Sequence, residues 1–193
     1  MTKGFTLIEL LIVIAIVAVL AVAVVLVLNP AELIKQSRDS TRISDLSAID
    51  AALGLWLADV VNTSSWGTGG TTRCTSGTVE PGGIASSCAQ NVIRTTEGSG
   101  WVGPVSLDLI SGGSPLSLLP LDPSNGQTTC AGSPAVCFYA FEPFATVGKY
   151  KLGANMESVK FGNGGSADVE LDSKDGGTVP TWHETGTAVS TAW

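Results

Sequence analysis

Positive charge is scarce in this sequence. Ten Lys and Arg residues stand against 17 Asp and Glu, which gives a formal net charge of −7. General nucleic-acid binding depends on clustered Lys and Arg, so nucleic acid is not indicated as a partner. Many copies of such a chain would form a negatively charged, soluble surface.

Residues that often carry out catalysis are also few. The chain has one histidine, His183, and contains neither G-x-S-x-G nor G-x-x-x-x-G-K, the patterns of a common nucleophile turn and of a phosphate-binding loop. His183 lies between Trp182 and Glu184, and we interpret it as a surface residue without a catalytic partner. The sequence therefore predicts no enzyme and no cofactor.

The first part of the chain is a long apolar run. Every residue from Leu10 to Leu28 is Leu, Ile, Val or Ala. A helix of this length spans roughly 28 Å, close to the apolar thickness of a bilayer, and it lacks the polar face of a soluble helix. We predict a membrane-spanning helix, and Lys3 places its N-terminus in the cytoplasm.

The leader before this run is unusually short. Secretory signals are cut after their apolar part, whereas here the natural cut lies before it, between Gly4 and Phe5. That cut would leave a free amine on Phe5. Glu9 is a carboxylate at membrane depth, where such a group usually has a partner. The Phe5 amine can be the partner of Glu9, either in the same chain or in a neighbouring one. Alternatively, Glu9 only lies at the lipid interface, beside the positive end of the helix dipole.

The segment from Lys3 to Leu10, KGFTLIEL, resembles the N-terminal signature of type IV pilins and type II secretion pseudopilins. The resemblance implies that a prepilin peptidase cuts between Gly4 and Phe5 and that Phe5 is N-methylated. It also implies a helical filament of identical subunits, in which Glu9 of an incoming subunit neutralises the Phe5 amine of the last one added.

The same resemblance implies a structural function outside the cell. The chain would begin as a single-pass protein of the inner, cytoplasmic membrane, and an assembly platform with cytoplasmic ATPase motors would extend the filament. Filaments of this family serve adhesion, twitching motility or DNA uptake. Two alternatives remain open: a type II secretion pseudopilin or minor pilin, and a singly membrane-anchored extracellular binding module.

Composition divides the chain into four expected segments: a leader (1–4), a hydrophobic helix (5–28), an amphipathic helix (29–61) and an extracellular globular domain (62–193). Pro30 removes a backbone donor and clashes with the preceding turn. It therefore predicts a helix kink, or else it only marks the membrane exit.

Within the amphipathic segment, apolar residues recur every three or four positions. The stripe comprises Ile43, Leu46, Ile49, Leu53, Trp56, Leu57 and Val60. It is expected to hold the globular domain. The charged residues of this segment, such as Asp39 and Arg42, can pair along the helix. We interpret them as a solvated face, although the stretch from Arg38 to Arg42 could equally contact another subunit.

The remaining chain is rich in glycine, serine, threonine and proline, which predicts loops and short strands. Strands are expected over residues 136–141, 149–154 and 167–171. The resemblance adds a short antiparallel sheet packed on the helix, so the expected fold class is α+β. The stretch 119–126 resembles the Asp-Pro turn that many pilins have before the sheet.

Four cysteines, Cys74, Cys88, Cys130 and Cys137, lie in the part expected outside the cell. An even number in an exported domain predicts disulfides. Proximity favours the pairs 74–88 and 130–137 among three connectivities. Zinc is the competing interpretation, and it is disfavoured because no C-x-x-C pair is present.

An acidic, glycine-containing stretch near the end contains Asp168, Asp172 and Asp175. Hard oxygen ligands suit calcium, and the resemblance adds that major pseudopilins bind calcium in a C-terminal loop. The spacing does not match an EF-hand, and Lys174 interrupts the acidic residues. A solvated turn is the preferred interpretation, with these three residues as the calcium alternative.

Overall fold

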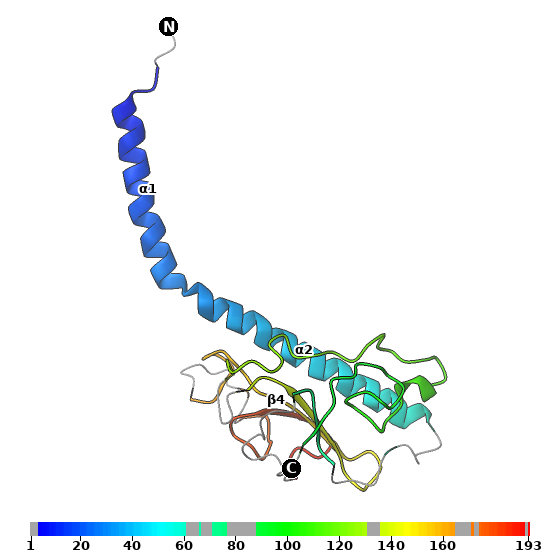
Figure 1. Cartoon of the computed structure of the whole chain (residues 1–193). Coiled ribbons are helices and arrows are strands. Elements are labelled where there is room, and N and C mark those ends of the chain that lie inside the picture. Colours follow the sequence, from blue (N-terminus) through cyan, green and yellow to red (C-terminus); the bar gives the residue numbers. More distant parts are fainter. Residues whose placement is uncertain are drawn as a thin grey trace. The chain divides into compact units, whose positions relative to one another are not determined.

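The computed structural model describes residues 4–60, 66, 71–76, 88–130, 136–164, 171, 174–191 and 193. Two helices come first in the chain, α1 (Leu7–Leu28) and α2 (Pro30–Asp59) (Figure 1). The chain divides into two units, Met1–Lys35 and Gln36–Trp193. We call the second unit the head.

Helix α1 has a defined beginning and a defined end. The Thr6 hydroxyl caps its N-terminus by accepting from the Glu9 backbone N–H, and the Glu9 carboxylate accepts from the Thr6 backbone N–H; together these bonds form a capping box. The stretch Leu7–Val25 has a mean hydropathy of 3.2 and is long and apolar enough to cross a membrane. Its side chains are exposed.

A single residue separates the two helices. Asn29 has the left-handed backbone conformation, with φ 40° and ψ 72°, and α2 begins at the next residue, Pro30. Proline suits the first position of a helix because the N–H that it lacks would have no partner within the helix. The helical path is therefore interrupted at the Asn29–Pro30 pair.

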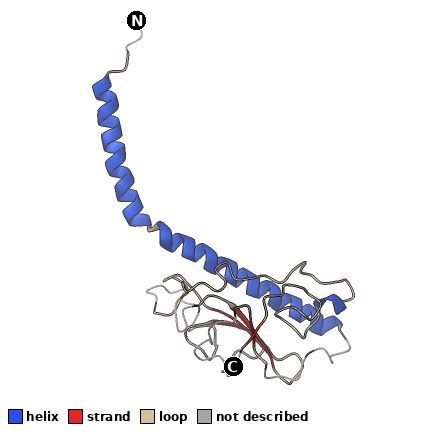
Figure 2. Cartoon of the chain, viewed as in Figure 1, coloured by secondary structure: helices blue, strands red, loops and turns tan. Residues whose placement is uncertain are grey.

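Five short strands form the sheet of the head: β1 (Arg73–Cys74), β2 (Ala89–Gln90), β3 (Tyr139–Pro143), β4 (Tyr150–Ala154) and β5 (His183–Gly186), in the order β2-β1-β3-β4-β5. Figure 2 shows that loops make up most of the described chain around them. The α+β class is confirmed. The sheet is mixed rather than antiparallel, because β1 and β2 are parallel; a disulfide between Cys74 in β1 and Cys88 directly before β2 holds this pair together.

The strand predictions had different outcomes. The one over 149–154 matches β4 within one residue. The one over 136–141 is wrong at its start: the backbone N–H and C=O of Cys137 pair with Gln127 and Gly126 instead of a strand, so β3 begins at Tyr139. Of the stretch 167–171, only Leu171 is described, and it lies in no strand.

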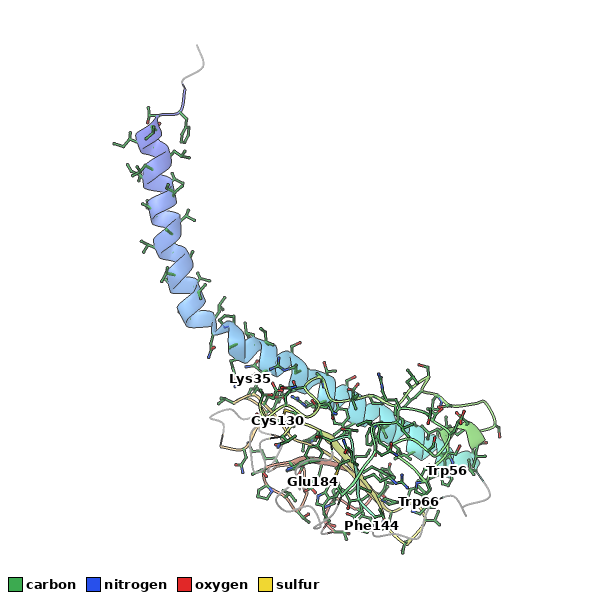
Figure 3. The ribbon with its side chains drawn as sticks, in the orientation of Figure 1. Lys35, Trp56, Trp66, Cys130, Phe144 and Glu184 are labelled. Carbon is green, nitrogen blue, oxygen red and sulfur yellow. A yellow bond between two sulfur atoms is a disulfide. The ribbon has the colours of Figure 1, made fainter. Side chains whose placement is uncertain are left out.

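Helix α2 packs on one face of the sheet. Alternate residues of β3 and β4 point toward it, as the two-residue period of a strand requires. The resulting core contains Leu46, Ile49, Leu53 and Trp56 from the predicted stripe and Tyr139, Phe141, Tyr150 and Leu152 from the strands. Trp56 lies against Trp66, with ring centroids 5.6 Å apart, and the Trp66 indole donates to the carbonyl of Phe144 at 3.0 Å (Figure 3).

The opposite, outer face of the sheet has a small core of its own. It contains Cys74, Val136, Phe138, Ala140, Val179 and Trp182, with Cys88 and Trp193 packed against it. Phe138 and Trp182 meet edge to face at 4.8 Å. Both faces of the sheet are therefore covered, one by α2 and the other by the last part of the chain.

Candidate processing and assembly site

The predicted cleavage site lies in a non-helical segment. Gly4, Phe5 and Thr6 precede the first turn of α1, and Phe5 is 77% exposed. The Gly4–Phe5 bond is therefore reachable by another protein without unwinding a helix. In the uncut chain the Phe5 nitrogen is part of this peptide bond, so it is not a charged amine.

Glu9 has a partner within its own chain. Its Oε2 accepts hydrogen bonds from the Thr6 N–H at 2.9 Å and from the Thr6 hydroxyl at 2.7 Å. An acidic residue in the first turn also complements the helix dipole. Before the cut, Glu9 thus acts as part of the N-terminal cap; the assembly role of Phe5 and Glu9 remains a prediction.

These N-terminal features have a counterpart in known proteins. Residues 1–25 match the family model of the prokaryotic N-terminal methylation motif. The chain carries a prokaryotic N-terminal methylation motif. This motif is the class III signal peptide of type IV pilins and pseudopilins, and it supports a pilin-like or pseudopilin precursor. Comparison of the whole chain with curated proteins and with solved structures finds no match.

The methylation motif has general consequences for this chain. It implies processing by a prepilin peptidase and assembly into a filament. With the apolar helix α1 it fits a membrane-anchored precursor. It points to a structural protein rather than an enzyme.

Later in the chain, a group of charges that is mostly buried attaches α2 to the rest of the head. We call it the α2 ion cluster: Arg38, Asp39, Arg42, Asp122 and Glu157. Arg42 is fully buried; it donates to Asp39 at 2.7 Å, to both oxygens of Asp122 at 2.7 and 2.8 Å, and to Glu157 at 2.9 Å. Asp39 in turn accepts from the backbone N–H groups of residues 157 and 158 at 3.0 and 2.8 Å.

The electrostatics of this cluster favour the charged forms. Burial alone would raise the pKa of Glu157, but hydrogen bonds from Arg38, Ser124 and Arg42 lower it to about 2. Burial alone would lower the pKa of Arg42, and its three carboxylate partners raise it instead. A fully partnered buried cluster of this kind fixes one geometry.

The prediction of a solvated charged face on α2 is wrong. Asp39 and Arg42 are fully buried. Further along, Asp45 accepts from the Tyr139 hydroxyl at 2.7 Å, and Asp50 accepts from the Tyr150 hydroxyl at 2.7 Å. Burial raises the pKa of Asp45, and the Tyr139 hydrogen bond opposes this. Asp39, Arg42, Asp45 and Asp50 are therefore hydrogen-bonded to other parts of the head.

The exposed face of α2 is correspondingly free of charge. From residue 37 to residue 58, all of them described, its exposed positions are Ser37, Ser40, Thr41, Ser44, Ser47, Ala48, Ala51, Gly54, Leu55 and Ala58. Apart from Leu55, these side chains are small. A helix face of this kind can approach another helix closely without burying an unpaired charge.

The cysteines form the two disulfides that proximity in the sequence predicts, Cys74–Cys88 and Cys130–Cys137. None of the four, all described, is free, so they offer no thiolate to zinc. Cys137 Sγ lies 3.4 Å from Glu157 Oε1, which places the second disulfide beside the α2 ion cluster. Cys130 is labelled in Figure 3.

Of the calcium candidates, Asp168 and Asp172 lie outside the described residues. Asp175 is described; its carboxylate accepts from the backbone N–H of Gly177 at 2.7 Å and from that of Glu184. His183 Nδ1 lies 3.6 Å from it, and only 14% of the His183 side chain is exposed, contrary to the predicted surface position. Asp175 thus organises a turn; its use as a calcium ligand stays a prediction.

Asp122 and Glu157 are structural residues that sequence reasoning missed. The stretch 119–126 does turn as expected, with the N–H of Asn125 donating to the carbonyl of Asp122. Nothing local shows that the Asp122 carboxylate points to Arg42. A signal that could have found the pair is the spacing of Arg38, Asp39 and Arg42, which places three charged side chains on one side of the helix.

Proposed function

We propose that this chain is the structural subunit of a type IV pilus-like extracellular filament, built through its N-terminal helix and serving adhesion, twitching motility or DNA uptake. The observation that carries the proposal is the methylation motif at residues 1–25, which includes the stretch Leu7–Val25, long and apolar enough to cross a membrane. Prepilin peptidase would release the chain between Gly4 and Phe5 and methylate Phe5.

Two features of the chain support assembly after this cut. The new Phe5 amine supplies the positive charge that Glu9 lacks in the precursor, and a charge pair between neighbouring subunits would set their stagger. The uncharged outer face of α2 would let the packing of apolar helices continue beyond the membrane-spanning stretch. Extension would require an assembly platform and ATPase motors in the membrane.

The test is to shear cells, collect the high-molecular-weight surface fraction and determine the mass of the N-terminal peptide of this chain. The expected result is a peptide that begins with methylated Phe5 in that fraction. A peptide beginning at Met1, found only in membranes, would overturn the proposal and favour the singly anchored binding module.

The same preparation separates a pilus subunit from a type II secretion pseudopilin or minor pilin. A major pilin would dominate the sheared fraction, whereas a pseudopilin would be cut and methylated but stay with the membranes. Thermal unfolding of the purified chain with calcium and with a chelator adds a second criterion. A much higher unfolding temperature with calcium than with the chelator would favour the pseudopilin. Asp168, Asp172 and Asp175 would then be the residues to substitute.

A further inference from the structure

A lysine is buried on the outer face of the sheet, outside the features discussed above. Lys151 on β4 is 0% exposed. Its Nζ donates to Glu184 Oε1 at 2.8 Å and to the Thr178 hydroxyl at 2.9 Å, and lies 4.9 Å from the centre of the Trp193 ring. An amine and a carboxyl group are thus held in contact and away from water.

Glu184 (labelled in Figure 3) is fixed in orientation by further contacts. The Val179 backbone N–H donates to its Oε2 at 2.8 Å, and the Trp193 indole N–H donates to its Oε1. The chain at Gly177 passes so close to this carboxyl group that any side chain there would overlap it. A backbone donor on an acyl oxygen is the arrangement that stabilises a developing oxyanion.

A second carboxyl group faces Lys151 from the neighbouring strand. Glu142 on β3 is directly opposite Lys151 in the sheet register, and such partners have Cβ atoms about 4.5–5.5 Å apart. Glu142 is 5% exposed, and its Oε2 has no hydrogen-bond partner within the described part of the chain. Burial raises the pKa of Glu142, while the charge of Lys151 opposes this, so this carboxyl is suited to holding a proton.

We propose that Lys151 and Glu184 condense to an intramolecular isopeptide bond that joins β4 to β5, with Glu142 carrying the protons. The groups resemble those of an acyl-transfer site: an amine nucleophile, a fixed carboxyl carbon, an oxyanion donor and a proton carrier. The proposal does not depend on the proposed filament function.

The reaction balances without any added reagent. A proton first moves from Lys151 Nζ to Glu184 Oε1 along their 2.8 Å hydrogen bond. The Nζ lone pair attacks Cδ, and the negative charge collects on Oε2 beside the Val179 N–H. Glu142 protonates Oε1, which leaves as water, and takes up the proton released by the nitrogen. One C–N bond forms, one C–O bond breaks, and nothing is oxidised or reduced.

The test is mass spectrometry of the full chain, purified from membranes in detergent with both disulfides intact. The expected mass is lower by one water than that calculated for the processed sequence. Trypsin should then give a branched peptide that joins residues 150–160 to residues 175–193. A folded chain of full mass, which trypsin cuts after Lys151 and which gives residues 175–193 as a separate peptide, would overturn the proposal.

Three variants sharpen this result. Lys151→Arg keeps the cation but lacks the amine, so it should retain the full mass, whereas Lys149→Arg on the same hairpin should still lose one water. Glu142→Gln keeps both reacting groups and should slow bond formation in newly made chain by about 100-fold, a typical effect of a lost proton carrier. Unchanged formation in Glu142→Gln would overturn the role given to Glu142.

Discussion

Arg42 on α2 donates two parallel hydrogen bonds to the carboxylate of Asp122, a residue 80 positions later in the chain. The fork of the guanidinium matches the two oxygens, which gives this contact a single geometry. It joins the helix to the turn at 122–126, and through Glu157 the same arginine also joins the loop that follows β4.

Replacement of Arg42 should be strongly destabilising. Arg42→Met keeps much of the volume but leaves the buried carboxylates of Asp39 and Asp122 without their cation, which costs on the order of 3–5 kcal/mol. Urea unfolding of the detergent-solubilised chain measures the change. The matched control is Arg38→Met: its side chain is 32% exposed, and the expected loss is about 1 kcal/mol. Equal losses would show that Arg42 does not organise the cluster.

Acid should weaken the head through Glu157. Its folded pKa, about 2, lies below the ordinary value of 4.5, so its ionised form is favoured in the folded state. This contribution to stability is complete above about pH 4.5 and is lost as the pH falls toward 2. The free energy of unfolding measured from pH 7 to pH 2 should show this loss. Glu157→Gln, although less stable at neutral pH, should show a shallower decline; a parallel decline would contradict the assignment.

Each disulfide should contribute measurably to stability. Cys74→Ser with Cys88→Ser opens a loop with a sequence separation of 14, for which the chain-entropy model gives about 3 kcal/mol. Cys130→Ser with Cys137→Ser opens a loop with a separation of 7, for which the same model gives about 2.5 kcal/mol. Because Cys137 also contacts Glu157, this second pair should in addition change the acid dependence of unfolding. An acid profile identical to that of the parent chain would show that the disulfide and the cluster are uncoupled.

Substitution of Glu9 can separate capping from charge pairing. Glu9→Gln keeps an oxygen that can accept from the Thr6 N–H but removes the charge, whereas Glu9→Ala removes both. If Glu9 pairs with the Phe5 amine of a neighbour, both variants should be cut and methylated yet be absent from the sheared fraction. If Glu9 serves only as a cap, Glu9→Gln should assemble normally. Peptide masses in the membrane and sheared fractions give the answer.

The uncharged face of α2 predicts an assembly defect without a folding defect. Ala51 is exposed on that face. The urea concentration at the midpoint of unfolding should therefore be the same for Ala51→Arg as for the parent chain, within experimental error. In a filament, the same arginine would place an unpaired charge between packed helices, and the yield of sheared filament should fall at least about ten-fold. Ala51→Ser is the matched control and should assemble. Normal yields for Ala51→Arg would show that this face stays in solvent.

The sequence predicts well those features that depend on neighbours in the chain. The apolar run, the stripe through Leu46 and Trp56, and the pairing of cysteines seven and 14 positions apart all follow from local spacing. Strand β4 was found because its residues alternate between the faces of the sheet over five positions.

Features that depend on distant contacts could not be predicted in this way. Helical spacing shows that Asp39 and Arg42 share a face of α2, but not that this face meets Asp122 and Glu157. Strands β1 and β2 have two residues each, too few for an alternation pattern to be seen. The same holds for the Lys151–Glu184 contact, because only the order of the strands brings these residues together.

The burial of the α2 charges affects how the head responds to the salt concentration around it. Dissolved ions screen exposed charge pairs, but they screen buried pairs much less. The bonds between Arg42 and its carboxylates are fully buried, so the attachment of α2 to the rest of the head should hold at low and at high salt concentration alike. A change of salinity would leave the outer face of this helix in the same place.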